Sequence, residues 1–276
     1  IAMGMRRLSI IDIAGSDQPL YNEDRSIALV FNGEIYNYKE LRRDLITREH
    51  AIRTDGDGET IIHLYEEYGL NLFDHLRGMY GFALWDSNHQ RLVLAVDHIG
   101  MKPLYVSERG GMLHFASEVK AFADVGGMNL DVLDTYLSFG YMIGTDTLFK
   151  GVQRIPPGHT LVAEGGKTRL EEHWRFGVGT GFDLRADDEQ GWINRARDLI
   201  SDSVKLHMRS DVPVGLFLSG GVDSASMLAL MRQHADSIQT FTVGYDAKTP
   251  DNELLQARKI AAHFKTTHHE RVITAE

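Results

Sequence analysis

Cysteine is absent from the 276 residues of this chain. Without a thiol, the chain as given forms no disulfide, no thiolate metal site and no cysteine nucleophile. It also has no apolar run approaching the roughly 20 residues that a membrane helix needs, and its first residues lack the sustained apolar core of a signal peptide. We therefore expect no membrane partner and a cytoplasmic location.

Positive charge is also in short supply. Lysine and arginine number 29 against 39 aspartates and glutamates, and the net charge of −10 argues against general binding to nucleic acid or anionic membranes. The composition, 43% hydrophobic and 25% charged, is that of an ordinary globular protein, and the length allows two domains. The chain opens on Ile1 and ends at Glu276 without a closing signal, so we expect an internal piece of a longer protein.

The most informative stretch begins with the apolar run 214–218, a predicted strand that ends in a small polar turn before a predicted helix over 225–233. Two adjacent glycines let the backbone turn tightly, and the free N–H groups of such a turn and of the first helical turn can bind an anion. The serines can add hydroxyl donors, and the aspartate can hold a divalent cation. Glycines that serve only packing are the alternative, and the Walker A pattern is absent. The predicted phosphate loop consists of Ser219, Gly220, Gly221, Val222, Asp223 and Ser224.

The rest of the C-terminal half alternates helices with strands. Its predicted helices cover 192–208 and 252–264, and its further strands cover 240–245 and 269–273. This β-α-β-α-β order predicts a parallel, doubly wound α/β sheet that binds its ligand at the carboxyl ends of the strands. Ser219 and Val243 both fall there. The pair His268-His269 is interpreted as structural rather than as a metal site.

In the N-terminal half, four predicted strands follow two predicted helices, without β-α-β alternation. Its predicted strands cover 6–13, 27–31, 78–85, 91–97, 103–107, 112–117, 161–163 and 172–174. Asn32-Gly33 after the second of these could form a hairpin turn. No alternating pattern returns, however, and Asn37 with Glu40 is typical of a helix N-terminus with a capping box. The order predicts an α+β layered domain. A shift to Gly, Thr, Asp and Arg over 175–188 predicts a linker, which divides the chain into 1–180 and 181–276.

Acidic residues gather at the start of another predicted helix, in Asp55-Gly-Asp-Gly-Glu59. Asp57 and Glu59, near the N-terminus of this helix, interact favourably with the helix dipole. Gly69 is a natural end for the helix. An EF-hand is rejected, because the remaining ligands and the closing glutamate are missing at the required spacing.

Four further motifs occur in one order in the N-terminal half. They are Arg7-Leu8-Ser9-Ile10-Ile11-Asp12, Phe31 to Tyr38, Tyr80-Gly81-Phe82-Ala83 and Phe115-Ala116-Ser117-Glu118. This half resembles the glutaminase domain of class II glutamine amidotransferases, which have the N-terminal-nucleophile hydrolase fold, an αββα sandwich. Joined to the phosphate loop, which resembles that of ATP pyrophosphatases, it makes the chain resemble the glutamine-hydrolysing asparagine synthetase family. The resemblance implies that 181–276 is a truncated HUP-like sheet.

The resemblance assigns roles in the glutaminase half. Arg7 would bind the α-carboxylate of glutamine, with contacts extending to Ile10 and Ile11. Asn32 and Gly33 would form the oxyanion hole, and Glu34 with Asp57 would hold the α-amino group. These residue types suit their roles, because arginine pairs with carboxylates and carboxylates accept from an ammonium group. The family's nucleophilic cysteine is missing; we expect it upstream of Ile1, so the chain as given should not hydrolyse glutamine.

In the synthetase half, the resemblance implies ATP over the phosphate loop, with Leu218 and Val243 flanking the adenosine and Asp223 on Mg²⁺. The implied reaction converts aspartate to asparagine through an acyl-adenylate, with release of AMP and pyrophosphate. The expected partners are the small molecules glutamine, ATP and a carboxylate, with a homodimer left open. Two alternatives stay open: a homologue that amidates another carboxylate in an antibiotic, β-lactam or polysaccharide pathway, and a non-catalytic relative that binds nucleotide or glutamine.

Overall fold

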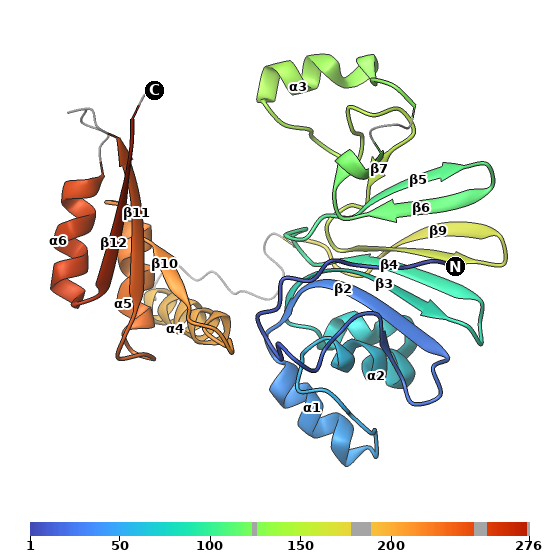
Figure 1. Ribbon diagram of the computed structural model, residues 1–276, viewed down its shortest axis with the longest axis horizontal. Helices are drawn as coiled ribbons and strands as arrows, with labels where there is room; N and C mark the ends of the chain where they lie inside the picture. The colour runs from blue at the N-terminus through green and yellow to red at the C-terminus, as the bar shows by residue number, and fades with distance from the viewer. Residues whose placement is uncertain (123–125, 178–188, 246–252, 275–276) are drawn as a thin grey trace. The chain divides into compact units, whose positions relative to one another are not determined.

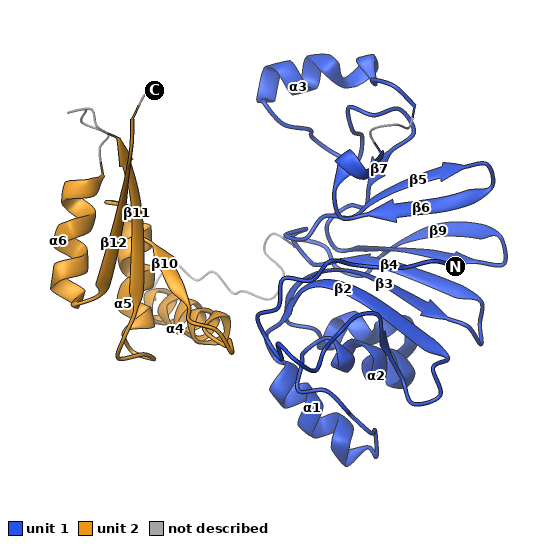
Figure 2. Cartoon of the chain, viewed as in Figure 1, with its two compact units in different colours: residues 1–180 blue, residues 181–276 orange. Residues whose placement is uncertain are grey.

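The computed structural model describes residues 1–122, 126–177, 189–245 and 253–274. The chain forms two compact units, Ile1–Thr180 and Gly181–Glu276 (Figures 1 and 2). Within the described ranges, none of the helices combines the length and apolar character needed to cross a membrane.

Unit 1 is built on a six-stranded antiparallel sheet in the order β1-β2-β3-β4-β8-β9. Its strands are β1 (Leu20–Tyr21), β2 (Ile27–Ile35), β3 (Gly78–Asp86), β4 (Arg91–Val96), β8 (His159–Glu164) and β9 (Lys167–Glu172). Successive side chains of a strand point to opposite faces. The central strands are apolar at nearly every position because both faces of this sheet are covered.

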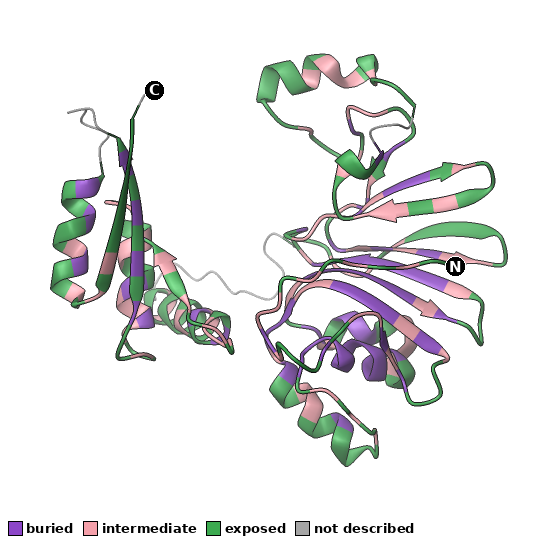
Figure 3. Ribbon diagram, viewed as in Figure 1, coloured by how far each residue is buried: buried purple, intermediate pink, exposed green. Residues whose placement is uncertain are grey.

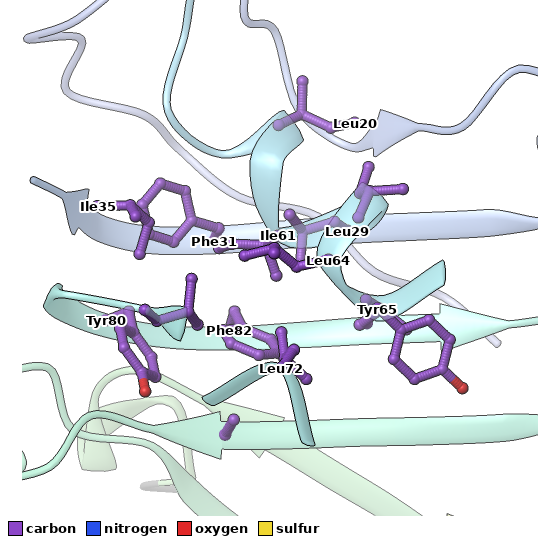
Figure 4. Close-up of a cluster of buried hydrophobic side chains, with 14 of the residues drawn as sticks. Leu20, Leu29, Phe31, Ile35, Ile61, Leu64, Tyr65, Leu72, Tyr80 and Phe82 are labelled. Carbon is purple, nitrogen blue, oxygen red and sulfur yellow. The ribbon is translucent and has the colours of Figure 1, made fainter. Parts of the chain in front are cut away.

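Helices cover one face of the sheet. They are α1 (Tyr38–Thr47), α2 (Glu59–Tyr68) and the 3-10 helix η1 (Gly69–His75). Alternate residues of β2 and β3, such as Phe31 and Phe82, join Ile61 and Leu64 of α2 in one buried cluster (Figure 4). Gly69 ends α2 with a positive φ of 56°, as its position after the last periodic residue predicts.

A second sheet covers the opposite face. It has the order β6-β5-β7, with β5 (Tyr105–Arg109), β6 (Met112–Ala116) and β7 (Gln153–Arg154). The intervening positions of the main sheet, such as Val30 and Leu94, pack there against Val106 and Ile155. Beyond it lies α3 (Leu133–Phe139), which has no buried residue, with the 3-10 helices η2 (Val119–Phe122) and η3 (Leu130–Val132) nearby in the chain (Figure 1). This layering confirms the predicted αββα class.

Three local predictions for unit 1 are wrong. Residues 6–13 form no strand, because side chains there bond to the local backbone: Arg7 donates to the carbonyls of Ile11 and Asp12. Asn37 precedes α1 but does not cap it; its side chain bonds the backbone of His75 and Arg77 instead. The last strand of the sheet is β9 rather than 172–174, since β8 turns back at once through Gly165-Gly166. The hairpin alternative for Asn32-Gly33 is also excluded, because β2 runs through both residues.

Unit 2 is a parallel sheet, as the sequence predicts, and its three strands have the order β10-β11-β12. Its elements are α4 (Glu189–His207), β10 (Gly215–Phe217), α5 (Val222–Met231), β11 (Gln239–Tyr245), α6 (Leu254–Phe264) and β12 (Thr267–Ile273). The helices pack on one face over Leu216 and Leu218. The other face carries the side chains of Phe217, Phe241 and Val243, which are exposed. Figure 3 colours large parts of this unit as exposed. The predicted linker 175–188 lies largely outside the described residues.

Candidate functional sites

Unit 1 contains a cavity of about 550 Å³. Its wall is formed by β2 and β3, by the N-terminal segment and by the turn before α2. All seven residues that the sequence assigns to a glutamine site line this one cavity. They are Arg7, Ile10, Ile11, Asn32, Gly33, Glu34 and Asp57. The fold thus brings together three segments that are separated by more than 20 residues in the chain.

Gly33 lines the cavity at a position where the backbone is tightly constrained. It pairs with Tyr80 across β2 and β3 and has a φ of +148°, a conformation that residues with a Cβ rarely adopt. A Cβ on Gly33 would lie 2.0 Å from the carbonyl oxygen of Met79. The neighbouring Asn32 makes no side-chain hydrogen bond within the described part of the chain, so its amide is free to donate to a ligand. Only glycine fits at position 33.

Two buried carboxyl groups face the same cavity. Burial raises the pKa of Asp57, although its Oδ2 accepts a hydrogen bond of 2.8 Å from the Ile35 N–H and Arg7 exerts an opposing effect. Burial also raises the pKa of Glu34, and the negative charge of Asp57 adds to the increase. Two such carboxylates attract a cation, because a bound positive charge relieves both desolvation and mutual repulsion.

Two cationic residues line the same cavity. The Arg7 guanidinium is half-buried and is held by the carbonyls of Ile11 and Asp12, which leaves its remaining N–H groups for a ligand. Lys102 also lines the cavity and lowers the pKa of Glu34, a contribution that the sequence did not reveal. A cavity lined by both cations and carboxylates suits a free, zwitterionic amino acid.

Asp97 positions the loop that carries Lys102. Its buried carboxylate accepts four backbone N–H bonds of 3.1 Å, from Tyr80, Ile99, Met101 and Lys102. Its own N–H donates to the Tyr80 carbonyl at 2.9 Å. Because Tyr80 is the partner of Gly33, one carboxylate fixes the lysine-bearing loop to the strand behind the proposed oxyanion site.

The phosphate loop of unit 2 connects β10 to α5. Within the described residues, the N–H groups of Gly220, Val222 and Asp223 have no hydrogen-bond acceptor. The serines, in contrast, are already engaged: Ser219 Oγ lies 2.8 Å from Ser224 Oγ, which also accepts from the Ser219 N–H at 3.2 Å. The hydroxyls therefore bond within the loop and shape it, and their role as donors to an anion stays a prediction.

The remaining nucleotide residues lie along the same sheet. Leu218 is buried, and its N–H and carbonyl bond to β11 through Phe241 and Thr242. Val243 is 47% exposed on the uncovered face. Asp223, in the first turn of α5, is exposed and has no ion pair or hydrogen bond among the described residues, so its carboxylate suits Mg²⁺. A Cβ on Gly220 would lie 3.0 Å from Gln256 Cβ, which keeps the loop close to α6.

The comparisons with known proteins agree with this geometry. Residues 1–174 match the family model described as a glutamine amidotransferase domain, and residues 195–276 match the model described as asparagine synthase. The chain is 35% identical over its whole length to asparagine synthetase [glutamine-hydrolyzing] 1 of Bacillus subtilis, covering 44% of that protein. It is also 35% identical to the amidase chyE of Penicillium rubens, over 95% of the chain and 41% of that protein. The chain thus spans less than half the length of these relatives.

Among solved structures, the glutamine phosphoribosylpyrophosphate amidotransferase of B. subtilis, complexed with ADP and GMP, is similar at 18% identity and a TM-score of 0.42. That similarity covers 92% of this chain and 48% of that one. On the two family models and the curated relatives, the chain belongs to the glutamine-hydrolysing asparagine synthetase family.

Proposed function

We propose that this chain is part of an ATP-dependent amide ligase that takes its nitrogen from glutamine and makes asparagine from aspartate. The observation that carries the proposal is one cavity of unit 1, which is lined by Arg7 together with Glu34 and Asp57. An amino acid with a free carboxylate and a free ammonium group matches these charges. The family membership supplies the reaction class.

In the glutaminase half, the Arg7 guanidinium binds the α-carboxylate, and Glu34 with Asp57 binds the α-amino group. This places the side-chain amide of glutamine beside Asn32 and Gly33. The Asn32 amide and the Gly33 N–H then stabilise the oxyanion that develops when a nucleophile attacks; each such donor is typically worth about 3 kcal/mol of barrier. None of the 276 residues is a cysteine, so these residues bind and polarise the substrate without supplying the thiol.

In the synthetase half, the free N–H groups of the loop and the first turn of α5 hold the phosphates of ATP. Asp223 holds Mg²⁺, which neutralises phosphate charge. Attack of the substrate carboxylate on the α-phosphorus gives an acyl-adenylate and releases pyrophosphate. Ammonia then displaces AMP. Adenylation is needed because a free carboxylate is a poor acyl donor.

A second candidate is a ligase of the same family that amidates a different carboxylate. The similarity to a protein named as an amidase, at the same identity as to an asparagine synthetase, supports keeping this alternative. Both candidates require the same glutamine and nucleotide sites, and they differ only in the acceptor.

Calorimetric titration of the chain with glutamine tests the proposal. We expect one site in unit 1, loss of binding in Arg7→Gln and no release of glutamate. Ser237→Ala, an exposed position in unit 2, is the control and should bind glutamine normally. Absence of glutamine binding, or glutamate release by this chain, would contradict the proposal. A screen of carboxylates for AMP formation by an enzyme that contains the chain separates aspartate from other acceptors.

A further inference from the structure

Two histidines and a glutamate meet in unit 1 at a place that the proposed function does not use. His63 and Glu66 lie on the same face of α2, and His50 reaches them from the segment after α1. Glu66 Oε2 is 2.7 Å from His63 Nδ1 and 3.4 Å from His50 Nδ1. All three ligand atoms lie within 4.8 Å of one another, and the two imidazole rings are tilted by 52°.

The ring nitrogens that face away from this point each lie near a carboxylate. His50 Nε2 lies 3.0 Å from Glu67 Oε1, and His63 Nε2 lies 3.7 Å from Glu59 Oε1. Histidines that bind a metal usually present their second nitrogen to a carboxylate in this way, which fixes the tautomer and the ring orientation. The second oxygen of Glu66 accepts a hydrogen bond of 2.9 Å from Asn22 Nδ2, which orients that carboxylate as well.

His63 supplies an independent observation. Its side chain is fully buried, and its Nε2 has no hydrogen-bond partner. Glu59 is anchored on the other side, where it accepts bonds from the N–H groups of Arg53 and Thr54 at 2.7 to 3.1 Å. A cation bound at Nδ1 would place the ring proton of His63 on Nε2, facing Glu59. The orphaned nitrogen would then gain its partner.

We propose that His50 Nδ1, His63 Nδ1 and Glu66 Oε2 bind a divalent transition-metal cation of the zinc class. Two imidazoles and one carboxylate form a set that zinc accepts, with a fourth position left for water. Imidazole ligands favour such late first-row ions over Mg²⁺ and Ca²⁺. His63 is fully buried, His50 is half-buried and Glu66 is exposed, so the site is desolvated around the histidines and reachable from the Glu66 side.

The cation would join three segments that approach one another only in the folded chain. It would link α2 to the segment after α1 and, through Asn22, to the start of β2. Asp57 lies two residues before Glu59, so the same cross-link would stiffen the turn that carries a glutamine-binding carboxylate. The role is structural, because no residue of this cluster lines the cavity.

Titration of the metal-free chain with ZnCl₂ and with CoCl₂ tests the site. We expect one tight site per chain, a rise in melting temperature with Zn²⁺ and the intense visible absorption of four-coordinate Co²⁺. His50→Gln and Glu66→Gln should each weaken binding at least about tenfold, the low end of the loss that even outer-shell substitutions cause. His114→Gln, at an exposed histidine outside the cluster, is the matched control and should change nothing.

His50→Gln and Glu66→Gln change positions outside the core. They make the test independent of His63, whose replacement in the core could unfold the chain. Zinc X-ray absorption should show two imidazole ligands in the parent chain and one in His50→Gln. Absence of stoichiometric binding would overturn the proposal and leave His63 as an ion-paired core residue. Binding that is equal in the parent chain, His50→Gln and Glu66→Gln would also overturn it.

Discussion

The carboxylate of Asp57 accepts a 2.8 Å hydrogen bond from the backbone N–H of Ile35. This bond ties the acidic turn before α2 to the end of β2, directly after Asn32, Gly33 and Glu34. The two halves of the proposed ammonium site are therefore fixed to each other by the backbone, before any substrate is present. Predictions about glutamine binding follow from this contact.

Replacement of Asp57 should separate binding from stability. Asp57→Asn keeps an oxygen acceptor for Ile35 but loses the charge, so glutamine affinity should fall by about tenfold or more, as expected for a bond to an ionised group. The thermal stability of Asp57→Asn should not fall, because burial raises the pKa of Asp57 and so destabilises its ionised form.

Asp57→Ala should also lose about 1–3 kcal/mol of unfolding free energy, since the Ile35 N–H is left without a partner. Calorimetry and thermal melts measure both; normal glutamine affinity in Asp57→Asn would contradict the assignment.

Glutamine binding should weaken as the pH falls, beginning at a higher pH than ordinary carboxyl groups would cause. Binding requires ionised Glu34 and Asp57, and burial raises the pKa of both above the usual 4.5 and 3.8. Folding responds with the opposite sign: a raised pKa contributes stability below the unfolded pKa, and that contribution is lost as the pH rises through the folded pKa. Titrations over a pH series measure the first effect.

Lys102→Gln provides the control for that series. Lys102 lowers the pKa of Glu34, so its removal should move the loss of binding to still higher pH. A binding curve that is identical in the parent chain and in Lys102→Gln would show that Glu34 does not titrate in the site.

Gly33→Ala should destabilise unit 1 by about 3 kcal/mol, the upper part of the range for a strained backbone position. The added Cβ would meet the Met79 carbonyl oxygen at 2.0 Å, and the φ of +148° disfavours any side chain. Gly4→Ala is the matched control, because nothing lies within 4 Å of a Cβ there. Denaturant unfolding compares the two; equal stability would mean that β2 shifts freely at this point.

Ser224→Ala should weaken ATP–Mg²⁺ binding by about three- to tenfold. The Ser224 hydroxyl accepts from the Ser219 N–H and contacts Ser219 Oγ, and loss of one such hydrogen bond typically costs about 1 kcal/mol. Ser237→Ala, at an exposed serine in the same unit, should bind as the parent chain does. If the two variants bind ATP equally well, the serine pair does not organise the loop.

The sequence predicts most where one pattern repeats over a whole element. Periodicity located β11 and α6 to within a few residues, and their alternation gave the parallel order of unit 2. The residues proposed to bind glutamine were found through motifs that occur in one order, rather than through any local pattern. Their roles stay predictions, although the fold gathers Arg7 and Asp57 at one cavity.

The failures have physical causes. Residues 6–13 look like a strand, but Arg7 and Asp12 bond nearby backbone groups and so compete with sheet pairing. Asn37 has the residue type of a cap, yet η1 brings better partners, the backbone groups of His75 and Arg77. The cluster around Glu66 was not predicted, because only tertiary packing brings His50 to the pair His63 and Glu66 on α2.

The four backbone N–H groups that bond Asp97 fix the length of the loop between Asp97 and Lys102. Ile99 and Met101 are 65% and 52% exposed, so their side chains can be exchanged with little effect. Their backbone N–H groups, however, must reach the Asp97 carboxylate together with the N–H group of Lys102. One inserted or deleted residue between Asp97 and Lys102 would break these hydrogen bonds and move the lysine away from its position in the cavity. In this loop the count of residues matters more than their identity.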